Sequence, residues 1–365
     1  MQHLLEPEAW SSLKAWLVEQ GQAAFRAAQI RKWAFEGRAE SFDAMSDLPK
    51  KLRAELAAHF QLWTSKIVRH LQSADGTEKL LLELADGGRI ECVLLRDGER
   101  RSICISTQVG CAMGCVFCAS GLDGVDRNLT SGEIVEQMLL LARLLPPEER
   151  LSHIVVMGMG EPLANLDNLL PALREANAND GLGIGQRRIT ISTVGLPKQL
   201  NRLCELNPGY HLAVSLHAPN DELRNRIVPT SKKISLAEIL GAADRYFELS
   251  GRRLTFEYVL LAGINDKPEH ARELAALLRG RTALLNVIPY NPVAGLPYQT
   301  PSATAVHRFR DILVAGGINV KFRQRKGDEI NAACGQLRRS EPNVPDQLLT
   351  IRDGGNTPSS RSASR

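Results

Sequence analysis

The chain has 365 residues, of which 44% are hydrophobic and 24% are charged, and its formal net charge is +4. No stretch reaches the roughly 20 apolar residues that a membrane span requires, and the N-terminus lacks the apolar region of a signal peptide. We therefore expect a cytoplasmic globular protein without a membrane partner. The net charge alone does not establish a nucleic-acid partner, although Lys and Arg outnumber Asp and Glu in residues 22–70 and 320–339.

Residues 1–65 predict a small helical domain. Apolar residues recur at three-to-four spacing in residues 8–19 and 23–35, and a basic amphipathic segment follows in residues 49–60. Residues 66–101 alternate between apolar and polar side chains, and three Asp-Gly pairs mark hairpin turns within them. We expect a β-meander that links or extends the neighbouring domain.

Residues 102–339 predict successive strand-helix units around a parallel sheet. About six units are present, fewer than the eight of a complete barrel, so we expect an α/β fold of the partial (β/α)6 barrel type with its chemistry at the C-terminal ends of the strands. Residues 340–365 are polar and rich in Ser and Gly, which is typical of a disordered tail. The predicted strands are 102–107, 153–157, 188–193, 210–216, 254–261, 284–289 and 318–323, and the predicted helices include 131–145, 235–249, 268–279 and 302–315.

Three of the seven cysteines, Cys111, Cys115 and Cys118, crowd into a Cx3Cx2C spacing on a loop of small residues after a predicted strand. An odd, clustered set of cysteines suits a disulfide framework poorly and favours metal ligation. A [4Fe-4S] cluster held by three thiolates keeps one iron open for a cofactor. The alternative is structural zinc, which requires a closed set of four ligands, and no fourth Cys or His lies nearby in the sequence.

The Cx3Cx2C spacing, with the aromatic Phe117 before its last cysteine, resembles the signature of radical S-adenosylmethionine (SAM) enzymes. That resemblance implies an open iron that chelates SAM and cleaves it reductively to a 5'-deoxyadenosyl radical. The cofactors expected from it are one [4Fe-4S] cluster per chain and SAM, with an external electron donor such as flavodoxin or ferredoxin.

Further segments sharpen the resemblance to the RlmN family of RNA adenine-C2 methyltransferases. The sequences MGMGEP (157–162), ISTVG (191–195), VSLHAP (214–219) and IPYNP (288–292) each follow or end a predicted strand. Taken singly, each has an ordinary explanation as a turn, a helix cap or a core histidine. The resemblance implies that the SAM site is formed by Gly160, Glu161, Ser192, Ser215, Leu216, His217 and Asn291.

By the same resemblance, Cys334 carries the methyl group, Cys104 is its resolving partner and Glu91 is the general base. Carbon 2 of adenine is electrophilic, so a radical must replace an ordinary methyl transfer. The resemblance implies that a first SAM methylates Cys334 and that a second generates the radical that activates this methyl group. A base can then remove the C2 proton, and a second thiolate can release the product by forming a disulfide.

Each of these three residues also has an ordinary reading. Cys104 lies in an apolar strand and suits a core position, and Glu91 suits an ion pair with Arg89 or Arg101. Cys334 lies in a basic, glycine-punctuated loop, which favours a functional role. Buried structural thiols are the expectation for Cys92 and Cys204.

The resemblance also implies RNA substrates, namely 23S ribosomal RNA near the peptidyl-transferase centre and the anticodon loop of certain tRNAs. The N-terminal helices resemble the family's accessory RNA-binding domain, and a base modified inside a barrel must be unstacked. Two alternatives stay open, a Cfr-like methyltransferase acting at adenine C8 and a zinc-stabilised RNA-binding protein without catalysis. The basic residues offered for phosphate contacts are Arg26, Arg31, Lys32, Arg38, Lys50, Lys51 and Arg53, although a solvated helix face explains such charges equally well.

Overall fold

A computed structural model of the chain describes residues 1–206, 209–323 and 326–338. The tail 340–365, for which disorder is predicted, lies outside these residues. Among the described helices, none has the length and apolar character to cross a membrane.

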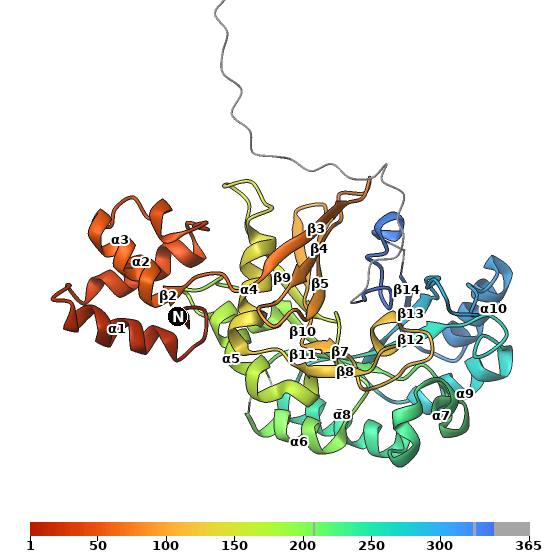
Figure 1. Cartoon of the computed structure of the whole chain (residues 1–365). Helices are drawn as coiled ribbons and strands as arrows, with labels where there is room; N and C mark the ends of the chain where they lie inside the picture. The colour runs from red at the N-terminus through yellow and green to blue at the C-terminus, as the bar shows by residue number, and fades with distance from the viewer. Residues whose placement is uncertain (207–208, 324–325, 339–365) are drawn as a thin grey trace, which may run out of the picture.

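The first 62 residues form a helical cluster at one side of the molecule (Figure 1). Its helices are α1 (Ala9–Glu19), α2 (Phe25–Phe35) and α3 (Lys50–His59), which confirms the three predicted helical segments. Two short strands, β1 (Gln2–His3) and β2 (Phe60–Gln61), pair in parallel and tie the start of the chain to the end of α3.

One ten-stranded sheet runs through the rest of the chain, in the order β14-β13-β12-β11-β10-β9-β6-β5-β4-β3. Its antiparallel part is β3 (Lys66–Gln72), β4 (Glu78–Glu83), β5 (Arg89–Asp97) and β6 (Arg100–Cys104). The three predicted Asp-Gly turns connect these strands, and each places its glycine at positive φ. Because β6 pairs with β5 on one side and in parallel with β9 on the other, the meander continues directly into the barrel sheet.

Seven parallel strands form the open barrel, and helices cover its outer face (Figure 1). The strands after β6 are β9 (His153–Val156), β10 (Ile189–Thr193), β11 (His211–Ser215), β12 (Leu254–Leu260), β13 (Ala283–Pro289) and β14 (Val320–Phe322). The helices are α4 (Ser131–Ala142), α5 (Leu166–Asn177), α6 (Pro197–Leu206), α7 (Asp221–Ile227), α8 (Leu236–Ser250), α9 (Pro268–Leu278) and α10 (Ala303–Ala315). Six strand-helix units followed by a last strand confirm the predicted partial barrel.

Local sequence signals explain where the helices begin. Helix α4 starts at a capping box in which the Thr130 side chain accepts from the Glu133 amide and the Glu133 carboxylate accepts from the Thr130 amide. Ser235 and Glu238 make the same reciprocal pair at the start of α8. The main hydrophobic core lies between these helices and the sheet.

A second, smaller apolar cluster lies under the cysteine loop. It is built from Phe117, Ala119, Ala218, Leu223, Ile227, Val228, Leu261, Tyr290 and Val293, with Cys115 and Cys118 packed against it. The loop that carries the cysteines is therefore supported by side chains from the C-terminal ends of several strands.

Candidate active site

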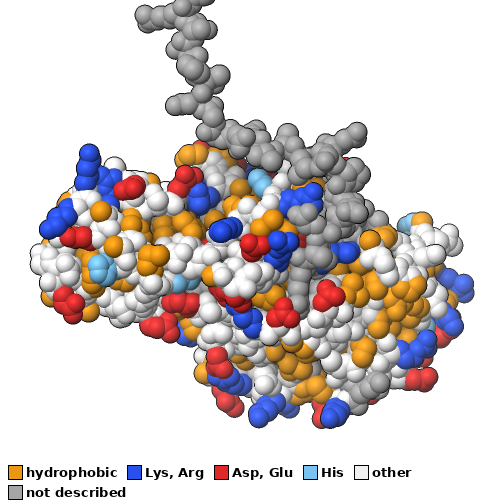
Figure 2. Space-filling view, in the orientation of Figure 1, with side chains coloured by type: hydrophobic (Ala, Val, Ile, Leu, Met, Phe, Trp, Pro, Cys, Tyr) orange, Lys and Arg blue, Asp and Glu red, His pale blue; other side chains and the backbone are white. Residues whose placement is uncertain are grey.

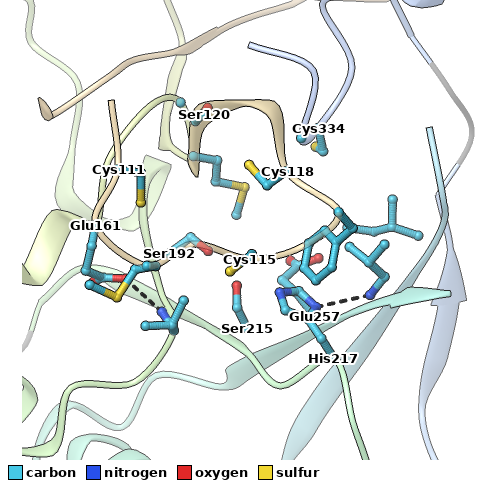
Figure 3. A pocket seen from close by; sticks show the side chains of 18 of the residues that line it. Cys111, Cys115, Cys118, Ser120, Glu161, Ser192, Ser215, His217, Glu257 and Cys334 are labelled. Atoms are coloured by element: carbon cyan, nitrogen blue, oxygen red, sulfur yellow. Dashed lines mark hydrogen bonds between the residues drawn. The ribbon is translucent and has the colours of Figure 1, made fainter. Parts of the chain in front are cut away.

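The loop that carries Cys111, Cys115 and Cys118 lies between the two strands of a hairpin, β7 (Gln108–Gly110) and β8 (Val125–Asn128). This hairpin was not predicted from the sequence. The amide of Cys111 donates to the carbonyl of Gly124 at 2.8 Å, closing the base of the loop. All three thiols line one cavity with an empty volume of about 920 Å³, counted out to open solvent, and their sulfur atoms face its interior (Figure 3).

The donor set fits a [4Fe-4S] cluster. Cys111, Cys115 and Cys118 are free thiols without disulfide partners. Burial raises the pKa of all three, that of Cys111 to about 12, so their deprotonation is coupled to the arrival of a metal centre. Three thiolates facing a shared cavity match three corners of a cubane with one iron left open. Among the described residues, no three His, Cys, Asp or Glu side chains gather as ligands for a single metal ion, so the closed ligand set of structural zinc is not seen there.

Polar side chains from four strand ends converge on the same cavity. Ser192 lies one residue before the end of β10, and Ser215 is the last residue of β11. Glu161 follows β9 and Asn291 follows β13, and all four residues line the cavity. This is the arrangement expected where parallel strands end in a barrel. Leu216 is the exception among the predicted SAM contacts, because its side chain is fully buried in the main core.

Glu161 is fixed by the backbone around it. Its Oε1 accepts from the Leu163 amide at 3.0 Å. Its Oε2 accepts from the Val194 amide at 2.9 Å (Figure 3). The side chain is 2% exposed, and burial raises the pKa of its carboxyl group. A buried acid held by two amides at the cavity wall is positioned to accept a hydrogen bond from a cationic amino group.

Gly160 precedes this acid with a φ of +103°, and an added Cβ would lie 2.7 Å from Cβ of Gln108. A side chain is therefore excluded both by conformation and by space. The backbone of Gly160 itself lines the cavity.

His217 is a neutral acceptor. It has a φ of +61°, its Nδ1 accepts from the Val259 amide at 3.1 Å, and its ring meets Phe117 edge to face at 4.9 Å. Burial, with Arg224 nearby, lowers its pKa to about 3. With Nδ1 used as an acceptor, the ring proton lies on Nε2.

Two buried oxygen atoms in the cavity wall have no hydrogen-bond partner among the described residues, Oε2 of Glu257 and Oδ1 of Asn291. Buried acceptors without partners are costly, so both fit donor groups of a ligand. The sequence reading did not single out Glu257. Its signal is an acidic residue within the apolar strand β12, where Asn286 Nδ2 donates to the other carboxylate oxygen at 2.9 Å.

Cys334 lies where this cavity meets a second, larger one. Asn291 Nδ2 donates to the Cys334 carbonyl at 3.1 Å, and the amide of Ala119 donates to the Gly335 carbonyl at 2.8 Å, so the Cys334 loop is bonded to the cysteine loop. Cys334 is accessible to solvent through the cavity yet surrounded by protein. Cys104 lines the second cavity, and burial together with nearby Cys334 raises its pKa to about 12.

Glu91 is placed differently from the two cysteines. It is 4% exposed, pairs with Lys79 Nζ at 2.7 Å and accepts from the Arg338 amide at 2.8 Å. The ion pair that the sequence suggested, with Arg89 or Arg101, is wrong, because those arginines pair with Glu83 and Glu149. Glu91 is not among the side chains that line the two cavities, and its role as a base stays a prediction.

Two family models match the chain. The Radical SAM superfamily model covers residues 105–275, and the model of the ribosomal RNA large subunit methyltransferase N-terminal domain covers residues 8–62. Together with the open barrel and its cysteine loop, these matches define a radical SAM protein.

Comparison with individual proteins narrows this class. A probable dual-specificity RNA methyltransferase RlmN of Rhodopirellula baltica is 66% identical over 344 residues, covering 94% of this chain and 92% of the relative. A protein described in the same words from Symbiobacterium thermophilum is 48% identical over 88% of this chain and 87% of its own length. A crystal structure of a radical SAM methyltransferase from Sphaerobacter thermophilus has a TM-score of 0.89 at 44% identity, covering 93% of this chain and 100% of that one. The chain belongs to the RlmN family of radical SAM RNA methyltransferases.

Proposed function

We propose that this enzyme methylates carbon 2 of adenine in 23S ribosomal RNA and in the anticodon loop of tRNA. The observation that carries the proposal is the position of Cys334 at the junction of two cavities, one lined by Cys111, Cys115 and Cys118 and the other by Cys104. A methyl carrier must face both its activating centre and its resolving thiol. Among the described residues, Cys118 and Cys334 are the cysteines that line both cavities, and Cys118 belongs to the Cx3Cx2C set, which leaves Cys334 as the candidate carrier.

The cavity around Cys111, Cys115 and Cys118 would hold the [4Fe-4S] cluster, which when bound supplies one electron for the reductive cleavage of SAM and takes one back at the end of the cycle. The wall formed by Glu161, Ser192, Ser215, His217 and Asn291 would hold SAM. An electron donor of the flavodoxin or ferredoxin type would serve the cluster, and the enzyme would act in the cytoplasm, where its thiols stay reduced.

Different residues of the protein would then carry out different steps of the reaction. The Cys334 thiolate displaces the methyl group from one SAM. Its S-methyl group loses a hydrogen atom to the radical derived from a second SAM, and the methylene radical forms a bond to C2 of adenine. Glu91 accepts the C2 proton. The Cys104 thiolate attacks the Cys334 sulfur, breaking the carbon-sulfur bond as the disulfide forms, and a proton completes the new methyl group.

The test separates the two cysteines. Cys104→Ala should load its methyl group, react once and stay crosslinked to RNA through Cys334, while Cys334→Ala should form no adduct. Denaturing gels of protein purified from cells would show a shifted, ribonuclease-sensitive band for Cys104→Ala alone. Free turnover by that variant, or the same band in Cys334→Ala, would contradict the assignment. Mass spectrometry of nucleosides made by the wild type distinguishes 2-methyladenosine from the C8 product.

A further inference from the structure

The second cavity extends from the C-terminal mouth of the barrel, where Cys334 and Asn291 line it, to the N-terminal ends of the strands, where Arg100 and Arg188 line it. Its empty volume is about 2210 Å³ counted out to open solvent. On β5 and β6 the lining residues are alternate ones, which is the pattern of side chains that point to one face of a sheet, while β9 and β14 contribute consecutive residues. The lining residues are Arg100, Ser102 and Cys104 on β6, His153, Ile154 and Val155 on β9, and Thr190 on β10.

The strand register orders these residues into levels. Ser102 lies opposite His153, and Thr190 lies opposite both Val155 and His211. Residues of the lining therefore run from the C-terminal level of Cys104 down to the N-terminal ends of the strands. Arg100 lies four positions before Cys104, which at about 3.3 Å per residue is a depth of roughly 13 Å.

Cationic side chains surround the opening at the N-terminal ends of these strands. Arg100, Arg187, Arg188 and Lys321 line the cavity there, and all four are exposed. Within the described parts of the chain, no ion pair joins any of the four to an acidic residue. The acid in the same lining, Asp97, is engaged by Lys326 Nζ at 2.9 Å.

His153 lies at this opening, and its pKa is affected by the same positive charges. Burial lowers the pKa of His153, and Arg100 and Arg188 lower it further. The two guanidinium groups therefore act on one point inside the opening. Lys326, and after it Arg100 and Lys321, lower the pKa of Asp97, the acid in the lining, so an anion at the opening would meet an excess of positive charge over this single carboxylate.

The N-terminal helices offer fewer cations to RNA than the sequence suggested. Arg31 pairs with Glu175 at 2.7 Å and Asp180 at 2.8 Å, and Arg38 donates to the carbonyls of Leu145 and Pro146. Both residues hold the helical domain against the barrel. On the face shown in Figure 2, Lys and Arg side chains alternate with Asp and Glu rather than forming one basic surface.

We propose that the unpaired RNA strand carrying the target adenine approaches through this opening, with its phosphates on Arg100, Arg187, Arg188 and Lys321 and its flipped base passing Thr190 toward Cys334. This inference rests on the proposed function, because it assumes that RNA is the substrate. The small side chains of Ser102 and Thr190 leave the interior open, where a complete barrel is filled by bulky branched residues. Sequence-independent phosphate contacts at an opening position the strand, and the pocket beyond it selects the base.

The first experiment compares two double variants with the same loss of charge. Arg187→Gln/Arg188→Gln removes two cations from the opening, while the control Arg272→Gln/Arg279→Gln removes two exposed cations from α9 and its C-terminal end, away from the cavity. Affinity for an RNA stem-loop with unpaired adenines is measured between about 50 and about 200 mM salt. Each lost single-strand phosphate contact should lower the slope of log K against log salt by about 0.7, so the first variant should lose about 1.4 and bind roughly tenfold more weakly. The control should bind as the wild type does.

The second experiment obstructs the passage with Thr190→Phe. Methylation of the RNA should fall at least about tenfold, while iron content and deoxyadenosine formation report that the barrel and its cluster site are intact. Wild-type RNA methylation by this variant would overturn the inference, as would an unchanged affinity and salt slope for Arg187→Gln/Arg188→Gln.

The wild-type enzyme separates this inference from the function on which it rests. If the wild type methylates adenine but the variants bind and react as it does, RNA enters elsewhere and only the route is wrong. If the wild type produces no methyladenosine, the proposed function is wrong, and the proposed RNA route is wrong as well because it assumes that function.

Discussion

Arg323 places Nη1 3.9 Å from the sulfur of Cys334. Burial raises the pKa of the Cys334 thiol, Arg323 opposes that rise, and Glu257 adds to it. Since only the thiolate is a nucleophile, the Arg323 guanidinium increases the fraction of Cys334 that is ready to react, against the larger effect of burial. Arg323 is thus a positioning residue for the methyl carrier.

Replacing Arg323 with Gln should slow the reaction of Cys334 at neutral pH on the order of tenfold, because burial and Glu257 then act on the thiol without opposition. The alkylation rate of Cys334 by iodoacetamide, followed by peptide mass spectrometry across pH, should show its midpoint displaced to higher pH. Arg323→Lys keeps the charge and should fall between the two. Coincident pH profiles for wild type and Arg323→Gln would show that the guanidinium does not act on the thiol.

The neutral state of His217 makes stability depend on pH. Its folded pKa is lowered to about 3 from 6.5, so between these values the unfolded chain binds a proton that the folded chain does not. Stability therefore falls as pH decreases through this window, by roughly 2 kcal/mol between pH 7 and pH 5. His217→Asn, which tolerates the positive φ and keeps an acceptor for the Val259 amide, should lose this part of the pH dependence. Denaturant unfolding at both pH values measures it, and equal losses in the two proteins would refute the assignment.

Gly160→Ala should disturb the part of the cavity wall that includes Glu161 and that we propose binds SAM. The new Cβ would lie 2.7 Å from Gln108, whose Oε1 accepts from the Glu161 amide at 2.9 Å. We expect a loss of about 1–3 kcal/mol in unfolding free energy and weaker SAM binding by calorimetry. Gly183→Ala is the matched control, because it has a φ of +63° with nothing near its Cβ. Equal SAM affinity in the two variants would show that the clash with Gln108 is harmless.

Glu136, on helix α4 of the barrel, is hydrogen-bonded to the segment that follows the helical domain. Its buried carboxylate accepts from the amide and hydroxyl of Thr64 at 3.1 and 2.7 Å and from those of Ser65 at 2.8 and 2.6 Å. Glu136→Ala should cost about 3 kcal/mol and should increase cleavage near residue 64 in limited proteolysis. Removal of residues 1–65 would leave this carboxylate buried without these partners, so point variants are the cleaner test of the domain's role in RNA binding. An unchanged melting temperature and cleavage pattern would argue against this anchor.

The periodic parts of the fold could be predicted from the sequence because one face of each element is buried. Strands β9 to β13 lie within the predicted segments or one residue outside them, and the Asp-Gly turns fix the meander. The convergence of Glu161, Ser192, Ser215 and Asn291 also follows from sequence, since parallel strands end at one edge of the barrel.

Features set by pairing between distant segments could not be predicted in this way. The strand expected to reach residue 107 ends at Cys104, because Thr107 and Gln108 turn to bond Met159. Lys79 meets Glu91 because the register of β4 and β5 makes them diagonal neighbours. The local sequence of neither strand predicts the register in which β4 and β5 pair.

The bonds between the cysteine loop and the Cys334 loop also bear on how the protein is made. The Ser120 hydroxyl donates to the Leu337 carbonyl, 217 positions later in the chain, and the Ala119 amide donates to Gly335. Since synthesis proceeds from the N-terminus, the cysteine loop leaves the ribosome long before these partners exist. Its final geometry is therefore a late event in biosynthesis, and a chain truncated before residue 335 would present its three cysteines without the segment that normally covers them.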